Sequence, residues 1–448
     1  MNKLLITVGI ILAVIWACVT AISLGVSSHI CDTLSRFTFG IFEGAIANMQ
    51  NGFYYDVPNK HMPIVAFLFL FSIAFFLYFG VSLKLLNARN TRNAFIIIAF
   101  FSILFRLILL PSVPVHENDF YRYLWDGKVF KSGINPYKYA PGDLEHPVGG
   151  FTPAEEKELA GLQKLREQNP VYFDRIGHRW APTIYPPSAQ LVFYLSSLIK
   201  TDSVIMMKLV FVLFDILTFF LIARILALIG MNPVFSVIYG WSPLVVKEIA
   251  NSAHYDSVPI FFMLLAIYLI IRSRLFAGAV TMAAAALAKF FPLFLVPVYA
   301  RRLKVKNLFF FASVFILAYI PFFLWDSTGI KKVFEGLRIY SQMWSYNGSI
   351  FVVIESIALW ITGNSEAALV TSKLLVTLAM VILIFYLATR RAPGELDIIH
   401  RAFIMLAVEP RGRPLVLLLG DPFFMLFSLP QLYNAFMVLD IQLFVFQP

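Results

Sequence analysis

Residues 113–141 form a dense block of polar and aromatic side chains directly behind an apolar stretch of the chain. The block contains two carboxylates, Asp119 and Asp126, together with Arg122 and Asn135. Polar groups at the edge of a bilayer are costly, so they usually have a function there. A carboxylate at a membrane surface can act as a general base, and its position indicates a substrate that is carried by a lipid.

The composition indicates a polytopic helical membrane protein. Of the 448 residues, 59% are hydrophobic and 14% are charged, and the mean hydropathy is +0.77. Apolar runs of about twenty residues recur along the chain, as membrane-spanning helices require. The net charge of +10 comes from short Lys and Arg clusters between these runs. Anionic lipid headgroups are therefore the expected counterions, and nucleic acid is not an expected partner.

The cysteines and the N-terminal segment narrow the class further. The chain has two cysteines, Cys18 and Cys31, which argues against a disulfide framework and against a cysteine metal site. The first apolar run, from Leu4 to about Val26, is too long for the core of a signal peptide, so we predict that it is a retained first span.

Eight apolar segments are predicted to be transmembrane helices: residues 4–26, 63–86, 94–110, 204–229, 233–250, 257–271, 306–325 and 368–389. The positive-inside rule assigns Lys3 and the basic loop around Arg89 to the cytoplasm, so Asp119 is predicted to lie outside. Residues 113–187 then form an extracytoplasmic catalytic loop. The sequence EEKELAGLQKLREQ within it contains good helix formers and predicts a helix at the interface.

Two apolar stretches do not fit a single membrane-spanning helix. Residues 188–201 are short for a full span, which favours a re-entrant or juxtamembrane helix. Residues 275–303 are interrupted by Lys289 and Pro292 and lie between two basic clusters. Two short segments hinged at the sequence KFFP would leave both clusters inside and bring Lys289 to the outer face. No repeat is visible, so residues 1–408 are treated as one membrane domain.

Four sequence fragments carry a resemblance to a known superfamily. They are DFYRYLWDGKVFKSGINPYKYAP from Asp119, YPPSAQL from Tyr185, WSPLVVKEIANSAHYDS from Trp241 and AAAALAKFFPLFLVP from Ala283. Their order and spacing over residues 94–390 resemble the GT-C glycosyltransferases, and above all glycosyltransferase family 87 and the polyprenol-phosphate-mannose-dependent mannosyltransferases. The resemblance implies an all-α, GT-C-like membrane fold with a large extracytoplasmic loop.

The resemblance also implies a reaction and a donor. An acidic residue in the first large extracytoplasmic loop would act on an acceptor hydroxyl, and the donor would be a sugar on a polyprenyl phosphate. Asp119 matches that acid. The family often carries a second acid directly before it, where this chain has Asn118.

The chemistry of glycosyl transfer assigns tasks to the other candidates. Asp119 would take the proton of the acceptor hydroxyl, and Arg122, Lys247 and Lys289 would neutralise the leaving lipid phosphate. Aromatic rings would stack on a sugar face, and Asn135 would bond a sugar hydroxyl. No cofactor is predicted, although the sequence does not exclude a divalent metal ion. The remaining candidates for substrate binding are Tyr123, Trp125, Asp126, Tyr137, Tyr139, Gln190, His254 and Asp256.

Structural roles compete with these functional ones. Asp119 could be a helix cap or an interfacial ion-pair partner, and Asp126 before a glycine could be a turn residue. His254 and Asp256 could cap the end of a span, and Lys289 could extend towards a lipid headgroup.

Two other functional classes fit a polytopic chain. A transporter or flippase would also use intramembrane charges and broken helices, although the hydropathy shows no inverted halves and the polarity is concentrated in one loop. A noncatalytic assembly subunit would keep the fold but would need no acid at position 119. We expect a glycosyltransferase of the bacterial plasma membrane, with mannose as the sugar and its active site facing outward, acting on a glycan, lipid or protein acceptor.

Residues 409–448 form an atypical tail. Related chains have a late motif with SP, PWY, W and PF, whereas this chain reads VEPRGRPLVLLLGDPFFML from Val408. A reading frame shifted by one base from Glu409 can encode SPVVDPWYFSWVIPFL, which leads to the hypothesis of a frameshift in this tail.

Overall fold

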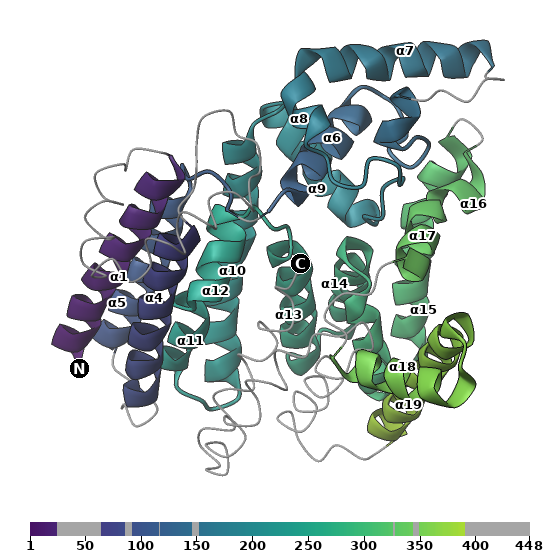
Figure 1. Ribbon diagram of the computed structural model, residues 1–448. Helices are drawn as coiled ribbons and strands as arrows, with labels where there is room; N and C mark the ends of the chain where they lie inside the picture. The colour runs from purple at the N-terminus through teal and green to yellow at the C-terminus, as the bar shows by residue number, and fades with distance from the viewer. Residues whose placement is uncertain are drawn as a thin grey trace. The chain divides into compact units, whose positions relative to one another are not determined.

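The computed structural model describes residues 1–24, 64–85, 92–115, 117–145, 152–325, 328–343 and 349–389. These residues form helices and connecting loops, and no strand occurs among them (Figure 1). Six of the described helices are long and apolar enough to cross a membrane. The predicted all-α fold is therefore confirmed, and the chain is a multi-pass membrane protein.

The chain packs as two compact units. The first unit contains residues 1–124, 175–177 and 199–257, and the second contains residues 125–174, 178–198 and 258–448, of which the tail from 390 onward lies outside the described residues. Helix α6 (Asp119–Lys131) contributes to both units. The other elements of the first unit are α1 (Asn2–Ser23), α4 (Ile64–Leu85), α5 (Arg92–Leu109), α10 (Val204–Leu228), η2 (Pro233–Ser236), α11 (Val237–Gly240), α12 (Pro243–Val246) and η3 (Lys247–Asn251).

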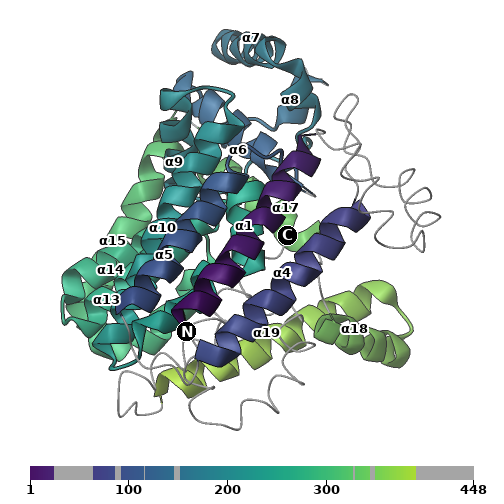
Figure 2. The same cartoon turned by 90° about the vertical axis from the view of Figure 1, so that its left-hand side faces the viewer.

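The N-terminal helix of the first unit lies beside two later helices. Helix α1 packs against α4 and α5, and Figure 2 shows these three helices side by side. Gly9 permits a close approach, because a Cβ atom there would lie 2.5 Å from the ring of Phe101. The hydroxyl of Thr20 donates to the carbonyl of Ile108 at 2.9 Å. The small residue and the interhelical hydrogen bond are both typical of membrane helix pairs.

The predicted span at residues 233–250 is wrong as a single helix. The segment consists of the 3₁₀ turn η2, the one-turn helices α11 and α12, and the π-helical turn η3. Pro243 is the physical reason for the central break, since proline cannot donate a hydrogen bond and disfavours a helical conformation at the residue before it. That residue, Ser242, has an extended ψ of 119°.

A buried ion pair satisfies the backbone at this break. Arg106 on α5 contacts Asp215 on α10 at 2.5 Å, and both side chains are fully buried. The Arg106 guanidinium also donates to the carbonyl of Gly240 at 2.7 Å. The hydroxyl of Tyr239 donates to Asp215. Irregular backbone inside an apolar environment requires such partners, so the pair allows the chain to turn within an apolar segment.

The second unit combines polar helices with apolar ones. The helix predicted from EEKELAGLQKLREQ is confirmed as α7, which begins with a capping box between Thr152 and Glu155. Its position at the membrane interface stays a prediction. The elements of this unit, besides the end of α6, are η1 (Pro141–Leu144), α7 (Pro153–Gln168), α8 (Pro170–Asp174), α9 (Pro187–Ile199), α13 (Ser257–Ile271), α14 (Leu275–Ala288), η4 (Phe291–Leu295), α15 (Val296–Leu324), α16 (Gly329–Val333), α17 (Glu335–Met343), α18 (Ser349–Thr362) and α19 (Ser365–Thr389).

The short helix α9 and the helix break at KFFP follow the sequence prediction, whereas their placement relative to the membrane stays a prediction. Helix α9 is a short apolar helix, and α14 ends at Ala288, where Lys289 adopts an extended conformation. The chain then returns through η4 into α15, which packs against α14. Pro292 is in the first turn of η4, where a proline without an N–H is well tolerated.

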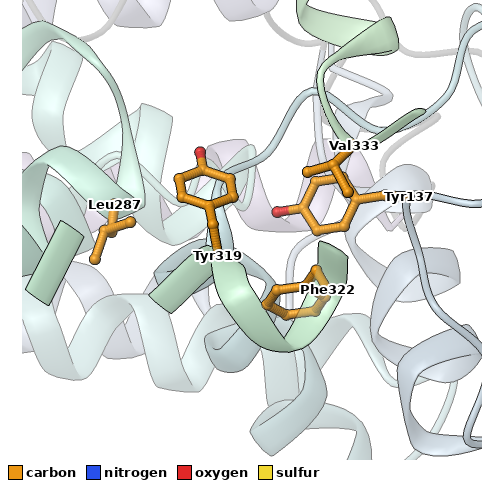
Figure 3. Packing of buried hydrophobic residues seen from close by; sticks show 5 residues of the cluster. All are labelled: Tyr137, Leu287, Tyr319, Phe322 and Val333. Atoms are coloured by element: carbon orange, nitrogen blue, oxygen red, sulfur yellow. The ribbon is translucent and has the colours of Figure 1, made fainter. Parts of the chain in front are cut away.

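An aromatic cluster forms part of the core of the second unit. Figure 3 shows Tyr137, Leu287, Tyr319, Phe322 and Val333, which are all at most 6% exposed. The rings of Tyr137 and Phe322 meet edge to face with their centroids 5.1 Å apart, a favourable geometry for aromatic pairs. The cluster therefore anchors the loop after α6 onto α14, α15 and α16.

Residues 409–448 lie outside the described residues. The frameshift proposed for this tail stays a hypothesis, which resequencing of the gene around codon 409 tests directly.

Candidate active site

The loop that leads from α5 into α6 is held in place by a buried lysine. Lys208 on α10 donates to the carbonyl oxygens of Leu109 and Ser112 at 2.8 and 2.9 Å, and its side chain is fully buried. Leu109 is the last residue of α5 and Ser112 follows it, and backbone acceptors at the end of a helix lack intrahelical partners. Lys208 therefore caps the end of α5 and fixes the start of the loop.

A second attachment comes from the π-helical turn η3. The side-chain amide of Asn251 donates to the hydroxyl of Ser112 at 2.8 Å and to the carbonyl of Val113 at 2.9 Å, while its oxygen accepts from the N–H of Val115 at 3.0 Å. All three polar bonds of Asn251 thus go to one stretch of loop. Short π-helical segments are frequent at functional sites because the extra residue redirects neighbouring side chains.

The third attachment is an imidazole surrounded by carboxylates. The Nε2 atom of His254 lies 2.6 Å from Glu117 and 3.3 Å from Glu248, and Nδ1 lies 3.5 Å from Asp256. Glu248 also pairs with Lys247 at 2.8 Å. The side chains of His254 and Glu117 are only 7% and 8% exposed. We call His254, Glu117, Glu248 and Asp256 the histidine cluster.

Glu117 connects the histidine cluster to the start of α6. Its Oε1 atom accepts hydrogen bonds from the backbone N–H groups of Asn118 and Asp119 at 2.9 and 2.8 Å. These are among the donors that a helix N-terminus leaves without intrahelical partners. The carboxylate therefore caps the helix on one side and binds His254 with its other oxygen.

Electrostatics keep this pair ionised. Burial alone would raise the pKa of Glu117, but the attraction of His254 and the hydrogen bonds to the Glu117 carboxylate outweigh it and lower the pKa to about 2. Burial would lower the pKa of His254, and the neighbouring Glu117, Asp256 and Glu248 instead raise it well above its usual value. At neutral pH Glu117 is thus a carboxylate and His254 an imidazolium, so Glu117 is a weak base.

Asp119 is the first residue of α6, with its side chain in the first turn. A carboxylate is stabilised there because the N-terminus of a helix is positively polarised. Arg122 and Tyr123, three and four positions further along, lie on the same face of the helix. Arg122 is 7% exposed, and the ring of Tyr123 packs against Tyr255 with centroids 5.4 Å apart. The first unit therefore brings Asp119, Arg122, Tyr123, Lys247, His254 and Asp256 into one region of the fold around the start of α6 and the end of η3.

In the second unit, Asp126 is part of a buried network. It accepts from the hydroxyl of Thr183 at 2.5 Å and from the amide of Gln190 at 3.1 Å, and it is 1% exposed. The Gln190 amide also donates to Thr183 at 2.9 Å. These contacts join α6 to the segment that leads into α9. Asp126 and Gln190 therefore stabilise the packing of the second unit.

Asn135 and Tyr137 also make structural contacts. Asn135 donates to the carbonyl of Phe322 at 2.9 Å and to the hydroxyl of Thr328 at 3.1 Å. The hydroxyl of Tyr137 donates to the carbonyl of Tyr185 at 2.7 Å, and burial raises the pKa of this hydroxyl well above its usual value. Both side chains hold the loop after α6 in place.

The remaining sequence candidates occupy three separate places. The hydroxyl of Tyr139 donates to Glu158 on α7 at 2.7 Å, and the ring of Trp125 meets that of Phe173 at 5.0 Å. Lys289 follows the last turn of α14 and is partly buried.

Sequence reasoning missed Glu117, Glu248 and Asn251. Glu117 directly precedes Asn118, the position at which the resembling family often carries a second acid. Its spacing before Asp119 is a signal that was available, because an acid two residues before a helix start can accept from the first free N–H groups. No comparable local signal marks Glu248 or Asn251, whose partners are far away in the chain. Within the described residues, no group of His, Cys, Asp or Glu is arranged to hold a metal ion.

Comparison with known proteins gives one family match. A family model described as alpha-(1->6)-mannopyranosyltransferase, N-terminal domain, matches residues 22–303, which is more than half of the 448 residues. The matched range includes α6, η3 and the histidine cluster. No curated protein and no solved structure gives a significant match.

Proposed function

Because the chain belongs to the alpha-(1->6)-mannopyranosyltransferase family, we propose that it transfers mannose from a polyprenyl-phosphate donor to an acceptor hydroxyl, with Asp119 as the base. Membership of this family makes the chain a mannosyltransferase. The donor and the role of Asp119 are the proposed parts. The single observation that supports the role of Asp119 is the geometry at the start of α6, where Asp119 occupies the first helical position beside the histidine cluster. The donor is proposed from the resemblance to polyprenol-phosphate-mannose-dependent mannosyltransferases.

The proposed reaction balances with residues of this chain. The Asp119 carboxylate takes the proton of the acceptor hydroxyl while that oxygen bonds to the anomeric carbon of mannose. The bond between the anomeric carbon and the phosphate oxygen breaks, and polyprenyl phosphate leaves with the electron pair. Cations must stabilise the charge that grows on this phosphate. We assign that task to Arg122, which lies one turn along α6 from Asp119, with Lys247 as a further candidate.

The location of the reaction follows from the charge pattern. We propose the plasma membrane of a bacterium, with the loop at residues 113–187 on the extracytoplasmic face. A polyprenyl carrier suits such a site because its apolar chain stays in the bilayer and presents the sugar at the surface. The acceptor is a glycan, a lipid or a protein that exposes a hydroxyl there. Membership of an enzyme family removes the reason to favour a transporter or flippase.

The test is a transfer assay with purified protein. The wild-type enzyme in lipid nanodiscs is expected to move mannose from polyprenyl-phosphate mannose to an acceptor from the cell envelope. Asp119→Asn should lower kcat by about a hundredfold or more, the usual scale for removing a general base, with an unchanged melting temperature. Near-normal turnover of Asp119→Asn would remove the catalytic assignment, and a wild-type enzyme that uses only nucleotide-activated mannose would rule out the lipid donor.

A further inference from the structure

We infer that Glu117 and His254 form a positioning pair, which fixes the N-terminus of α6 and with it the place of Asp119, and that Glu117 does not take the acceptor proton. This inference rests on the proposed function, because it concerns where the base of that reaction is held. It assigns the two carboxylates of the sequence HEND to different tasks.

Both oxygens of Glu117 are already engaged. Oε1 accepts from two backbone N–H groups at 2.9 and 2.8 Å, and Oε2 lies 2.6 Å from His254. A proton transfer to either oxygen would break the ion pair or weaken the helix cap. Asp119 contributes its N–H to this cap, so its backbone is fixed by the same carboxylate.

His254 is itself held from several directions. Its ring nitrogens contact Glu248 at 3.3 Å and Asp256 at 3.5 Å, and its backbone N–H donates to the carbonyl of Glu248 at 3.0 Å. Ala253, directly before it, has a left-handed backbone with φ of 62°, a conformation that persists only where the surroundings impose it. The imidazole therefore provides a rigid anchor for Glu117.

The connection to catalysis is geometric. A catalytic group that is misplaced by about 1 Å can lose about a hundredfold in rate. The loop before α6 is held at Leu109 and Ser112 by Lys208, at Val113 and Val115 by Asn251, and at Glu117 by His254. The contact between His254 and Glu117 is the attachment nearest to Asp119 along the chain. Its loss should therefore lower kcat more than it changes KM.

Paired substitutions separate positioning from proton transfer. Glu117→Gln keeps an oxygen that can accept from both N–H groups, so kcat should fall less than about tenfold with KM unchanged. Glu117→Ala removes the cap, and kcat should fall by about ten- to a hundredfold, again with KM little changed. His254→Leu should resemble Glu117→Ala, whereas His254→Gln can still donate to the carboxylate and should recover most of the rate. Glu167→Gln, an exposed acid on α7, is the matched control.

A second readout does not depend on activity. Hydrogen–deuterium exchange of a peptide that covers Asn118 and Asp119 should speed up in Glu117→Ala and His254→Leu, because the two amides lose their acceptor. The same peptide should stay protected in Glu117→Gln and in the Glu167→Gln control. A peptide from α7 should exchange equally in all variants, which shows that the fold is intact.

The outcomes distinguish the two proposals. If Glu117→Gln is as inactive as Asp119→Asn while its exchange is unchanged, Glu117 takes part in the chemistry and the positioning role is wrong. If exchange at Asn118 and Asp119 does not respond to Glu117→Ala or His254→Leu, the pair does not hold the helix start, and the inference fails even where activity is lost. If the wild-type enzyme shows no lipid-dependent transfer, the proposed function fails, and the exchange measurement alone decides whether the pair fixes α6.

Discussion

At the scale of single residues, Glu117 and Asp119 lie two positions apart and have different proposed roles, because their surroundings differ. The contacts of the Glu117 carboxylate with the His254 imidazolium and with two backbone N–H groups lower its pKa and make it a weak base. Asp119 begins the helix, where the polarised N-terminus favours its charge. Here one acid provides the proposed chemistry and the other holds it in place.

The ion pair between Glu117 and His254 predicts a pH dependence of stability. The pKa of Glu117 is lowered from 4.5 to about 2, so its contribution is present above about pH 4.5 and is lost as the pH falls through about 2. The pKa of His254 is raised above 6.5, so its contribution is complete below about pH 6.5 and is lost as the pH rises through the elevated value. Both contributions are therefore complete between about pH 4.5 and 6.5.

His254→Gln tests this dependence, because the variant lacks the titrating imidazole. The difference in melting temperature between wild type and variant should be largest in that window and should shrink as the pH rises through the raised pKa of His254. Melting curves in detergent across this range provide the measurement, with Glu167→Gln as the control. A difference that stays constant with pH would mean that the charge on His254 does not stabilise the fold.

At the scale of elements, close packing depends on small residues at defined positions. Gly127 on α6 lies against the backbone of α9, since a Cβ atom there would be 2.4 Å from the carbonyl oxygen of Phe193. A backbone neighbour cannot rotate away as a side chain can. The polar contacts of Asp126 with Thr183 and Gln190 depend on the same close approach.

Gly127→Ala should therefore destabilise the protein by about 1 to 3 kcal/mol, the usual cost of overpacking a tight contact. Gly80→Ala is the matched control, because a Cβ atom at this position of α4 meets nothing within 4 Å. That change should leave stability unaltered or raise it by up to about 1 kcal/mol, because alanine favours a helix over glycine. Thermal unfolding in detergent compares the two. Equal stability of Gly127→Ala and wild type would show that α6 and α9 can move apart without cost.

At the scale of the whole molecule, the distribution of charge predicts which face of the membrane carries the site. Basic residues cluster before α5, and Asp119 follows that helix. Arg92 begins α5, so it should lie on the cytoplasmic side. The loop that contains α7 should lie on the opposite side, where a carrier lipid would present its sugar.

Cysteine labelling tests this topology. In a background with Cys18 and Cys31 replaced by serine, Glu156→Cys on α7 should react with an impermeant thiol reagent from outside intact cells. Arg92→Cys should react only after the membrane is opened. The reverse pattern would overturn the proposed orientation and with it the extracytoplasmic site.

Local sequence features determined much of this protein. The apolar runs gave most of the membrane helices, because span length and hydropathy are properties of a continuous segment. Pro292 after Lys289 marked the turn between α14 and α15, since proline acts on its own backbone neighbours. The fragment that begins at Asp119 located the candidate base, and its resemblance to mannosyltransferases agrees with the family match.

Only the tertiary structure decided which polar and charged side chains contact each other. Glu117 and His254 are 137 positions apart, and Asn251 and Ser112 are 139 apart, so no local pattern predicts either contact. Buried charges require partners, but helix packing selects which partners are available. The same packing supplied Arg106 and Asp215 to the break at Gly240, which allowed residues 233–250 to depart from the single helix that their hydropathy predicts. The local sequence thus identifies Asp119 as the candidate base. The pair of Glu117 and His254 that is proposed to position it forms only when distant segments pack together.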